Sequence, residues 1–425
     1  FVFTSVVNRY DEVKTKKLRV IKVKDGKNFK KQARRMVLDV PKEDFMRYLV
    51  RSKSVLDCRS KIQSIESSGS LKMNIQLIDT KFTIPASTLA LLDYYRIFDE
   101  IQQYKNEKSY FNISIDRNKL KPILETDGWY ELIIPEKQLE IDSIRKIEYA
   151  TDYAIMALKS YMDKFCKFEQ ERWEAPLLEF QEISATDNNF VDEYTFTVTP
   201  QNSLDTTGEE LDKFIEDIKS ILTDNNGLNE YEKKFDFNKN LCLFDFRSHL
   251  YAPLVCLKKG NTNIQITPVS LNEDEKLFVD YLKEFTENNG DVLENKSLYL
   301  LRNKSKVGMG FFVAGNFYPD YILWIDTPEK QYITFVDPKG LLRIMPDDPK
   351  IEFYKTIKDL EKQLAPTAGD KQIVLNSFIM SATKSADLHE WWHWDKTTRE
   401  AHNVYTLDDD QCVISMINKI CFLQS

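Results

Sequence analysis

The sequence lacks several features that would assign it to a class at once. No apolar run reaches the roughly 18 residues that cross a bilayer, and the N-terminus has no secretory signal. None of the six cysteines forms a CxxC pair, which argues against a zinc ribbon and a disulfide scaffold. There is no GxxxxGK[ST] phosphate loop, so we expect no ATP site in this chain. These absences favour a protein of the reducing cytoplasm without a membrane partner.

What the chain of 425 residues does contain is the composition of a globular protein. Apolar residues make up 42% of it, enough for a sizeable core in two or three domains. The chain opens at Phe1 and not at Met, and we expect it to be a piece of a longer protein. Its net charge of −8 means that a DNA partner would need local clusters of Lys and Arg, because phosphate contacts supply most non-specific affinity.

The densest basic stretch runs from Lys14 to Arg35, with eleven Lys or Arg residues and a single acid, Asp25. Asp25 and Gly26 predict a hairpin turn between residues 18–24 and 27–35. Such a hairpin is either a solvated edge whose lysines block further strand pairing or a surface that contacts phosphates. The sequence leaves both interpretations open.

Three segments follow one another along the chain. Residues 1–85 alternate apolar and polar side chains in short runs, which predicts a small β-rich segment. Residues 86–240 have mainly helical periodicity, as in the stretches 87–104 and 141–168, and predict a helical connecting domain. From residue 241, strands and helices alternate, and this predicts an α/β domain over 241–425 with a mixed sheet flanked by helices.

Two acids and a lysine stand at neighbouring strand ends in this last segment. Asp320 precedes an apolar strand, Asp337 ends the next one, and Lys339 lies two residues further on. If these strands form a hairpin, both carboxylates meet at one edge of the sheet, and Lys339 shares a face with Asp337.

This pattern suits the hydrolysis of a phosphodiester. Mg²⁺ prefers carboxylate ligands, a bound metal lowers the pKa of water, and a nearby lysine stabilises developing negative charge. We therefore expect Mg²⁺ at Asp320 and Asp337, with Mn²⁺ as a substitute, and Lys339 as a catalytic residue. The competing interpretation is a turn, because residues 337–340 (DPKG) are also good turn chemistry.

The helix predicted over residues 273–287 offers another carboxylate. Asp274 and Glu275 lie nearer its apolar stripe than Glu273 does, so a carboxylate there could complete the metal site. Asn272 and Glu275 are also spaced as a capping box, which gives Glu275 a structural alternative. Periodicity leaves the two roles nearly balanced.

Three cations precede the strand pair in the sequence. Arg302, Lys304 and Lys306 are placed to hold a DNA backbone next to the metal. The alternative is a solvated loop, and the sequence favours neither.

A different chemistry is suggested by the stretch from His389 to His393, which fits the zinc motif HExxH. Two histidines four residues apart on a helix can face one metal ion. A third ligand is required, and His402, the candidate, does not have the usual spacing. We favour packing of the intervening tryptophans against the sheet over a zinc protease, and also over stacking on exposed bases.

Several ordered motifs around Asp320 resemble one family. PVSLNEDEKLFVDYL, SLYLLRN, GMGFFVAGNFYPDYILWI, ITFVDPKGL and DPKIEFYKTI are similar to the C-terminal endonuclease region of the restriction (Res) subunits of type III restriction enzymes and related superfamily 2 helicase-nucleases. FCKFEQERWEAPLLEFQEI and NFVDEYTFTV resemble the helical region between motor and nuclease in that family. Residues 1–85 look like the segment after the last helicase motif.

The resemblance implies a PD-(D/E)xK nuclease fold, in which Asp320 and Asp337 are metal ligands, Lys339 is the catalytic lysine and Glu275 is the helix carboxylate. Asp337 stands where many relatives of the wider superfamily have Glu. The resemblance also implies an ATP-driven helicase motor in the same protein or complex, a methyltransferase subunit for modification, and defence against foreign DNA. The alternative is a module that binds DNA or joins a motor to partners without cutting.

Overall fold

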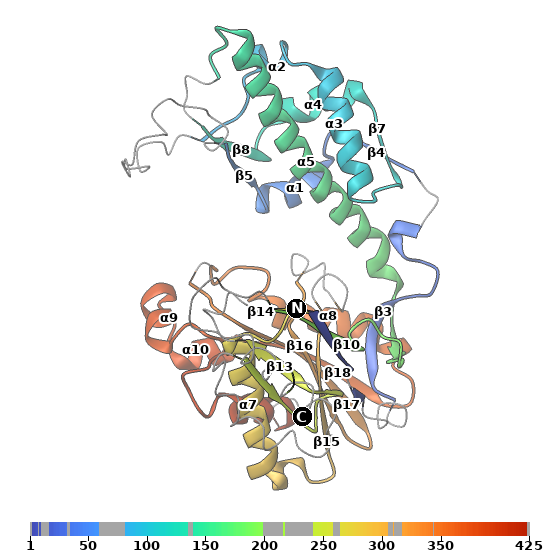
Figure 1. Cartoon of the computed structure of the whole chain (residues 1–425), viewed down its shortest axis with the longest axis vertical. Coiled ribbons are helices and arrows are strands. Elements are labelled where there is room, and N and C mark those ends of the chain that lie inside the picture. Colours follow the sequence, from blue (N-terminus) through green and yellow to red (C-terminus); the bar gives the residue numbers. More distant parts are fainter. Residues whose placement is uncertain are drawn as a thin grey trace. The chain divides into compact units, whose positions relative to one another are not determined.

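The computed structural model divides the chain into two compact units (Figure 1). The helical unit is Val23–Leu177, and the sheet unit combines Phe1–Lys22 with Leu178–Ser425. The residues that the structure describes are 2–6, 8–9, 17–31, 35–58, 81–134, 139–198, 216, 241–257, 264–304, 309, 317–342 and 344–422. Within these ranges, no helix combines the length and the apolar character needed to cross a membrane.

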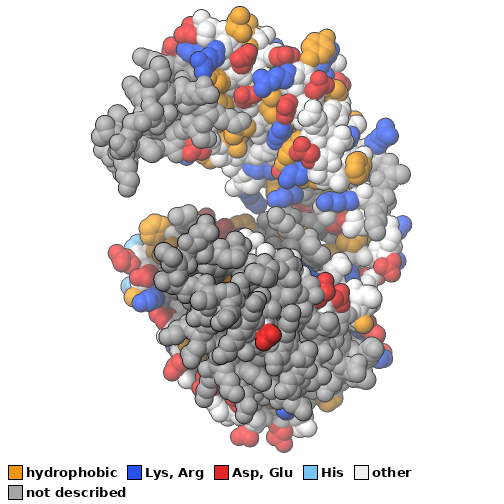
Figure 2. All heavy atoms as spheres, in the orientation of Figure 1, with side chains coloured by type: hydrophobic (Ala, Val, Ile, Leu, Met, Phe, Trp, Pro, Cys, Tyr) orange, Lys and Arg blue, Asp and Glu red, His pale blue; other side chains and the backbone are white. Residues whose placement is uncertain are grey.

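The helical unit is built around the long helix α5 (Ile144–Glu174), whose buried side chains form its core with the other helices. Its other elements are α1 (Glu43–Arg51), α2 (Ala86–Leu89), α3 (Tyr94–Glu107), α4 (Arg117–Glu125), β4 (Met36–Leu38), β5 (Ser54–Asp57), β6 (Lys81–Phe82), β7 (Ile113–Ile115) and β8 (Tyr130–Ile133). The strands form two small sheets, in the orders β4-β7 and β5-β8-β6. Figure 2 shows Lys and Arg side chains mixed with Asp and Glu over the face of this unit that it presents.

The helix predicted over residues 87–104 is two helices in the structure. Asp93 lies between α2 and α3, and its carboxylate accepts hydrogen bonds from the backbone N–H groups of Tyr95 and Arg96. This side-chain cap begins α3 as a separate helix. The helix predicted over 141–168 is confirmed as α5.

The basic stretch does not form the predicted hairpin in its described part. β3 (Arg19–Val23) is followed by a turn at Gly26, where φ is +72°, but Phe29–Lys31 then forms a 3-10 turn. β3 pairs instead with β9 (Leu178–Glu182). The hairpin prediction was wrong because residues 27–30 bury only Phe29 and have no alternating apolar face that could hold a second strand.

A five-stranded mixed sheet forms the centre of the sheet unit. Its order is β15-β16-β17-β18-β19, with β15 (Ser297–Arg302), β16 (Tyr321–Asp326), β17 (Lys330–Lys339), β18 (Gln372–Ser381) and β19 (Val404–Thr406). The first three strands are antiparallel to their neighbours, and β17, β18 and β19 are parallel. β16 and β17 consist almost entirely of buried residues because helices and further strands cover both of their faces.

The remaining elements surround this sheet. They are α7 (Glu273–Asn288), α8 (Phe353–Leu364), α9 (Ser385–Trp392), α10 (Lys396–Ala401), α11 (Cys412–Phe422), β1 (Val2–Val6), β2 (Asn8–Arg9), β10 (Glu193–Val198), β11 (Leu241–Phe244), β12 (Tyr251–Ala252), β13 (Leu254–Leu257) and β14 (Ile264–Thr267). α8 also protects the sheet edge, because Glu361 on this helix accepts the backbone N–H of Leu375 on β18 at 2.6 Å.

The chain is α/β, as predicted, but its two units differ from the three predicted segments. β1 pairs with β10, and β10 with β14, so strands from all three predicted segments lie in one sheet of one unit. Such pairings between distant strands leave no periodic signal in the sequence. The helix predicted over residues 208–222 lies, apart from Glu216, outside the described residues.

The packing of β16 makes a testable prediction about stability. Trp324 has no exposed surface, and its Nε1 donates to the carbonyl of Arg19 at 2.8 Å. We expect Trp324→Ala to lower the free energy of unfolding by about 3–5 kcal/mol. The matched control Trp391→Ala, at a side chain that is 57% exposed, should change it by less than about 0.5 kcal/mol. Urea denaturation measures both values, and equal losses would contradict this packing.

Candidate active site at the ends of two strands

The register of β16 and β17 brings the two predicted acids together. Asp320 directly precedes β16, and Asp337 lies two residues before the end of β17. Tyr321 pairs with Val336, so Asp320 and Asp337 lie side by side across the hairpin. The negative charge of Asp337 acts on the pKa of the Asp320 carboxyl, which indicates that the two side chains lie close together. The predicted hairpin is therefore confirmed.

Lys339 joins this pair on the same face of the sheet. β17 continues through Pro338 to Lys339, so residues 337 to 339 are strand and not the turn of the competing interpretation. Lys339 Nζ contacts Asp337 Oδ2 and lies 5.0 Å from the centroid of the Phe317 ring. Asp337 is only 3% exposed, so this ammonium group is the cation that offsets its buried charge.

The electrostatics of Asp320 reflect its surroundings. Burial raises the pKa of Asp320 well above its usual range, and the negative charges of Asp337 and Glu275 raise it further. The positive charge of Lys339 opposes this rise. Ionisation of Asp320 is thus unfavourable unless another cation is present.

The Asp320–Asp337 pair fits a magnesium ion in its chemistry. Mg²⁺ retains several waters and needs only one or two carboxylates from a protein. Burial, and after it the negative charges of Asp337 and Glu275, raise the pKa of Asp320, and a bound cation would stabilise its ionised form. Among the described residues, no group of three or more His, Cys, Asp or Glu side chains is arranged to hold a metal ion. The residues fit a site with two carboxylate ligands.

Glu275, the predicted third ligand, has a structural environment. The capping box is formed: the Asn272 side chain accepts the N–H of Glu275 at 2.9 Å, and Glu275 Oε2 accepts the N–H of Asn272 at 3.0 Å. Arg302 Nη2 donates to the same Oε2 at 3.0 Å. Since this carboxylate is 6% exposed and engaged twice, Glu275 acts on Asp320 through its charge and not through a shared ligand position.

Helix α7, which carries Glu275, packs on the face of the sheet opposite to Asp337. The ring of Phe278 on α7 lies 5.4 Å from the ring of Tyr321. Val336 pairs with Tyr321 and shares its face, so the next residue, Asp337, points to the other face. Helical periodicity in the sequence could not indicate on which face of the sheet α7 would lie.

Arg302, predicted to contact DNA, is directed into the protein. Its guanidinium donates to the carbonyls of Val269 and Ser270 and to Glu275, and its backbone N–H donates to His249 Nε2 at 3.0 Å. Burial opposes the charge of Arg302, but Glu275 together with Tyr321, Tyr251 and Tyr194 outweighs this effect, and the pKa of Arg302 is raised. We therefore correct its role from a DNA contact to an internal ion pair.

His249 is a buried histidine beside Arg302 that no motif in the sequence identifies. It is fully buried, and burial lowers its pKa to about 3, so the imidazole is neutral. Its Nδ1 lies 2.8 Å from the carbonyl of Tyr251, while Nε2 accepts from Arg302. His249 therefore holds the backbone of Arg302 in place by accepting its N–H, and no sequence motif predicts that role.

The other two predicted DNA contacts have different outcomes. Lys304 Nζ donates to the carbonyl of Phe190 at 2.8 Å, and its backbone N–H donates to Asn189 Oδ1 at 2.9 Å. These bonds attach the end of β15 to the segment before β10. Lys306 lies outside the described residues.

The HExxH stretch does not have the geometry that a zinc helix requires. α9 ends at Trp392, and His393 is its C-cap in a left-handed conformation, with φ 57° and ψ 26°. The two histidines are therefore not on one continuous helix. His402, the candidate third ligand, packs its ring 4.3 Å from that of Trp394. The expected packing of the tryptophans is confirmed for Trp392, whose Nε1 donates to the carbonyl of Ile344 at 2.9 Å, but not for Trp391, which is 57% exposed.

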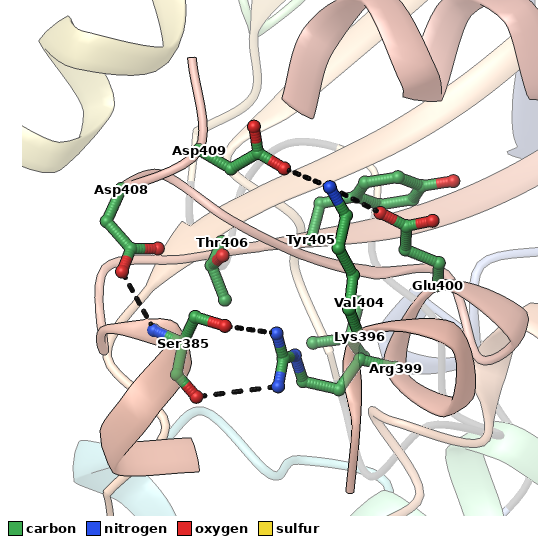
Figure 3. A pocket seen from close by; sticks show the side chains of 9 residues that line it. All are labelled: Ser385, Lys396, Arg399, Glu400, Val404, Tyr405, Thr406, Asp408 and Asp409. Carbon is green, nitrogen blue, oxygen red and sulfur yellow. Dashed lines mark hydrogen bonds and ion pairs between the residues drawn. The ribbon is translucent and has the colours of Figure 1, made fainter. Parts of the chain in front are cut away.

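A polar pocket of about 100 Å³ lies at the same end of the sheet strands as Asp337 and Lys339 (Figure 3). Lys339, Ser381 and Thr406 are successive partners across β17, β18 and β19, which relates this pocket to the strand-end acids. Lys396 contacts Asp409 at 2.7 Å, and the buried Arg399 donates to the carbonyl of Trp394. Lys396 and Arg399 already have acceptors within the protein, so the pocket does not offer cations to an anion. These interactions link α9, α10 and the segment after β19.

Comparison with protein-family models, with curated proteins and with solved structures finds no match to this chain. The resemblance described above is therefore an expectation, and any function has to be argued from the residues of the site.

The internal ion pair between Arg302 and Glu275 makes a prediction about stability. Arg302→Met leaves Glu275 buried without its cation, and we expect a loss of about 3–5 kcal/mol in the free energy of unfolding. The double variant with Glu275→Gln should recover part of that loss, because the uncompensated charge is gone. Urea denaturation gives these values. An unchanged stability in Arg302→Met would return Arg302 to the role of a surface DNA contact.

The raised pKa of Asp320 predicts a pH dependence of stability. Since the folded pKa lies above the unfolded value of about 3.9, the carboxyl contributes its full stability below that pH and loses it as pH rises through the folded pKa. Asp320→Asn, which cannot ionise, should melt at a higher temperature than the parent at pH 8 in the presence of a chelator. The difference should shrink towards pH 4. A constant difference across this range would contradict the assignment.

Proposed function

We propose that the sheet unit is a Mg²⁺-dependent endonuclease of the PD-(D/E)xK type that hydrolyses DNA phosphodiester bonds. The observation that supports this most is the meeting of Asp320, Asp337 and Lys339 on one face at the ends of β16 and β17. Two acids and a lysine are the side chains that phosphodiester hydrolysis with a hard divalent cation requires. The resemblance of the surrounding motifs to type III restriction subunits points to the same reaction.

Each of the three residues has a separate role in this proposal. Asp320 and Asp337 would hold the cation, which lowers the pKa of a bound water and offsets charge on the phosphate. Lys339 orients the attacking water and stabilises negative charge as it develops on the phosphate oxygens. The Phe317 ring lies beside the Lys339 ammonium, and this contact keeps the lysine near the strand end when its partner changes from Asp337 to the phosphate.

The surroundings of Asp337 make these electrostatic effects strong. Asp337 pairs in the sheet with Ile379, which belongs to a small apolar cluster with Leu341, Leu388 and Trp392. Parallel partners share a face, so this cluster lies beside the carboxylate. Because apolar neighbours lower the local dielectric constant, charges act on one another more strongly there than in water.

The partners in this proposal come from the resemblance. DNA is the substrate, and a helicase motor in the same protein or complex brings the nuclease to its cutting position. A methyltransferase subunit supplies modification, and the system acts against foreign DNA. Since this chain lacks a phosphate loop, ATP hydrolysis would take place in another part of the assembly.

Nicking of supercoiled plasmid DNA tests the proposal. We expect the purified chain to convert supercoiled plasmid into nicked and linear forms with Mg²⁺ or Mn²⁺ and to stop when a chelator is added. Asp337→Asn and Lys339→Met should each lower the rate by about 100-fold or more, because each removes a group that acts on the reacting phosphate.

Lys330→Met is the matched control for Lys339→Met, since Lys330 stands at the opposite end of the same strand. It should cut at the rate of the parent. Cutting by Asp337→Asn and Lys339→Met at the parent rate would refute the site assignment. A folded parent chain that binds DNA but never cuts it with either metal would favour the non-catalytic alternative.

A further inference from the structure

Two of the six cysteines face each other across a pair of antiparallel strands. β11 and β13 pair in a register that sets Cys242 directly opposite Cys256. Directly opposed residues in such a pair share a face of the sheet, so both thiols leave the strands on the same side. The two positions are 14 residues apart in the sequence, and no CxxC spacing reveals that they are neighbours.

The backbone pairing at these two residues sets how far a disulfide would have to reach. Leu257 N donates to the carbonyl of Leu271, and Leu271 N donates to the carbonyl of Val255. Residues 255 and 257 therefore direct their backbone groups away from β11, and Cys256, between them, directs its own towards Cys242. In a pair of this kind the Cα atoms are about 5.5 Å apart. Disulfides span Cα separations of about 4.4–6.8 Å but need Cβ atoms about 3.5–4.5 Å apart, which is closer than a hydrogen-bonded pair holds them. The two strands therefore have to draw together to close the bond, and the resulting disulfide is strained and readily reduced.

The different exposure of the two cysteines indicates which one reacts first. Cys242 is partly exposed, whereas Cys256 is fully buried, and both are reduced in the structure. A dissolved oxidant can thus reach Cys242 Sγ first. Cys256, which lies opposite Cys242 in the strand pair, then supplies the thiol that completes the exchange. The remaining cysteines lie on other elements: Cys58 after β5, Cys166 on α5, and Cys412 and Cys421 on α11.

We propose that Cys242 and Cys256 form a reversible disulfide when the protein meets a small-molecule disulfide such as oxidised glutathione. The thiolate of Cys242 attacks one sulfur of the oxidant and releases one glutathione thiol, which gives a mixed disulfide. Cys256, as its thiolate, attacks Sγ of Cys242 and releases the second glutathione thiol. The two cysteine thiols are oxidised, one oxidant molecule is reduced to two thiols, and two protons leave the cysteines.

The disulfide would change the contacts that β13 makes with the N-terminal end of α7. Cys256 Sγ contacts the carbonyl of Asn272, the N-cap residue of α7, at 3.8 Å, and Leu271 beside it bonds to β13. A disulfide turns Sγ of Cys256 towards β11 and closes a short loop of chain between the two strands. Closing that loop restricts the unfolded chain and stabilises the strand pair.

Peptide mapping of the oxidised full chain tests this inference. The protein is incubated with oxidised glutathione, alkylated with N-ethylmaleimide and digested with trypsin without reductant. Cleavage after Arg247 separates the two cysteines, so the disulfide should link the peptides Asn240–Arg247 and Ser248–Lys258. We expect the thiol content of the denatured protein to fall from six to four, and the melting temperature to rise until reductant is added.

Cys242→Ser should abolish both the linked peptide and the rise in melting temperature. Cys421→Ser is the matched control, because Cys421 is also partly exposed but lies on α11, and it should leave both results unchanged. A stable glutathione adduct on Cys242 without the link would overturn the proposal. A link between two chains, or one to any other cysteine, would overturn it as well.

Discussion

The candidate site depends on the backbone pairing between β16 and β17. With Tyr321 opposite Val336, the two acids lie next to each other and away from α7. A shift of β17 by one residue would turn Asp337 to the face on which Phe278 packs and would place Val336 beside Asp320. Buried residues on both faces of the two strands prevent such a shift, because it would also reverse every large apolar side chain, Trp324 among them. The apolar core therefore sets the geometry of the charged residues.

Elements whose signal lies within one stretch of sequence could be predicted. The long apolar runs of β16, β17 and β18 identify them as strands, and the regular apolar stripes of α5, α7 and α8 identify helices. The strand-end positions of Asp320, Asp337 and Lys339 follow from the same runs, since a short connection between two strands favours a hairpin. The capping box at Asn272 is likewise local, and it gave Glu275 the structural alternative that the structure shows.

Pairings between distant stretches could not be predicted. β3 pairs with β9, and β1 with β10, across most of the helical unit's sequence, so the units do not follow the predicted segment boundaries. The same limit applies to single side chains. Arg302 in a run of cations looks like a DNA contact, but its partner Glu275 is 27 residues away and its second support, His249, is 53 away. Local charge cannot distinguish a solvated cation from one that neutralises a buried acid.

The start of α7 is the place where these distant contacts meet. Arg302 and the Asn272 cap fix the carboxylate of Glu275, whose negative charge contributes to the raised pKa of Asp320. Cys256 Sγ contacts the carbonyl of Asn272. A small change in the position of this helix end, caused from β13, would alter the distance between Glu275 and Asp320. Because charge interactions in a buried site decline slowly with distance, such a change would reach the strand-end acids although no bond connects the two cysteines to them.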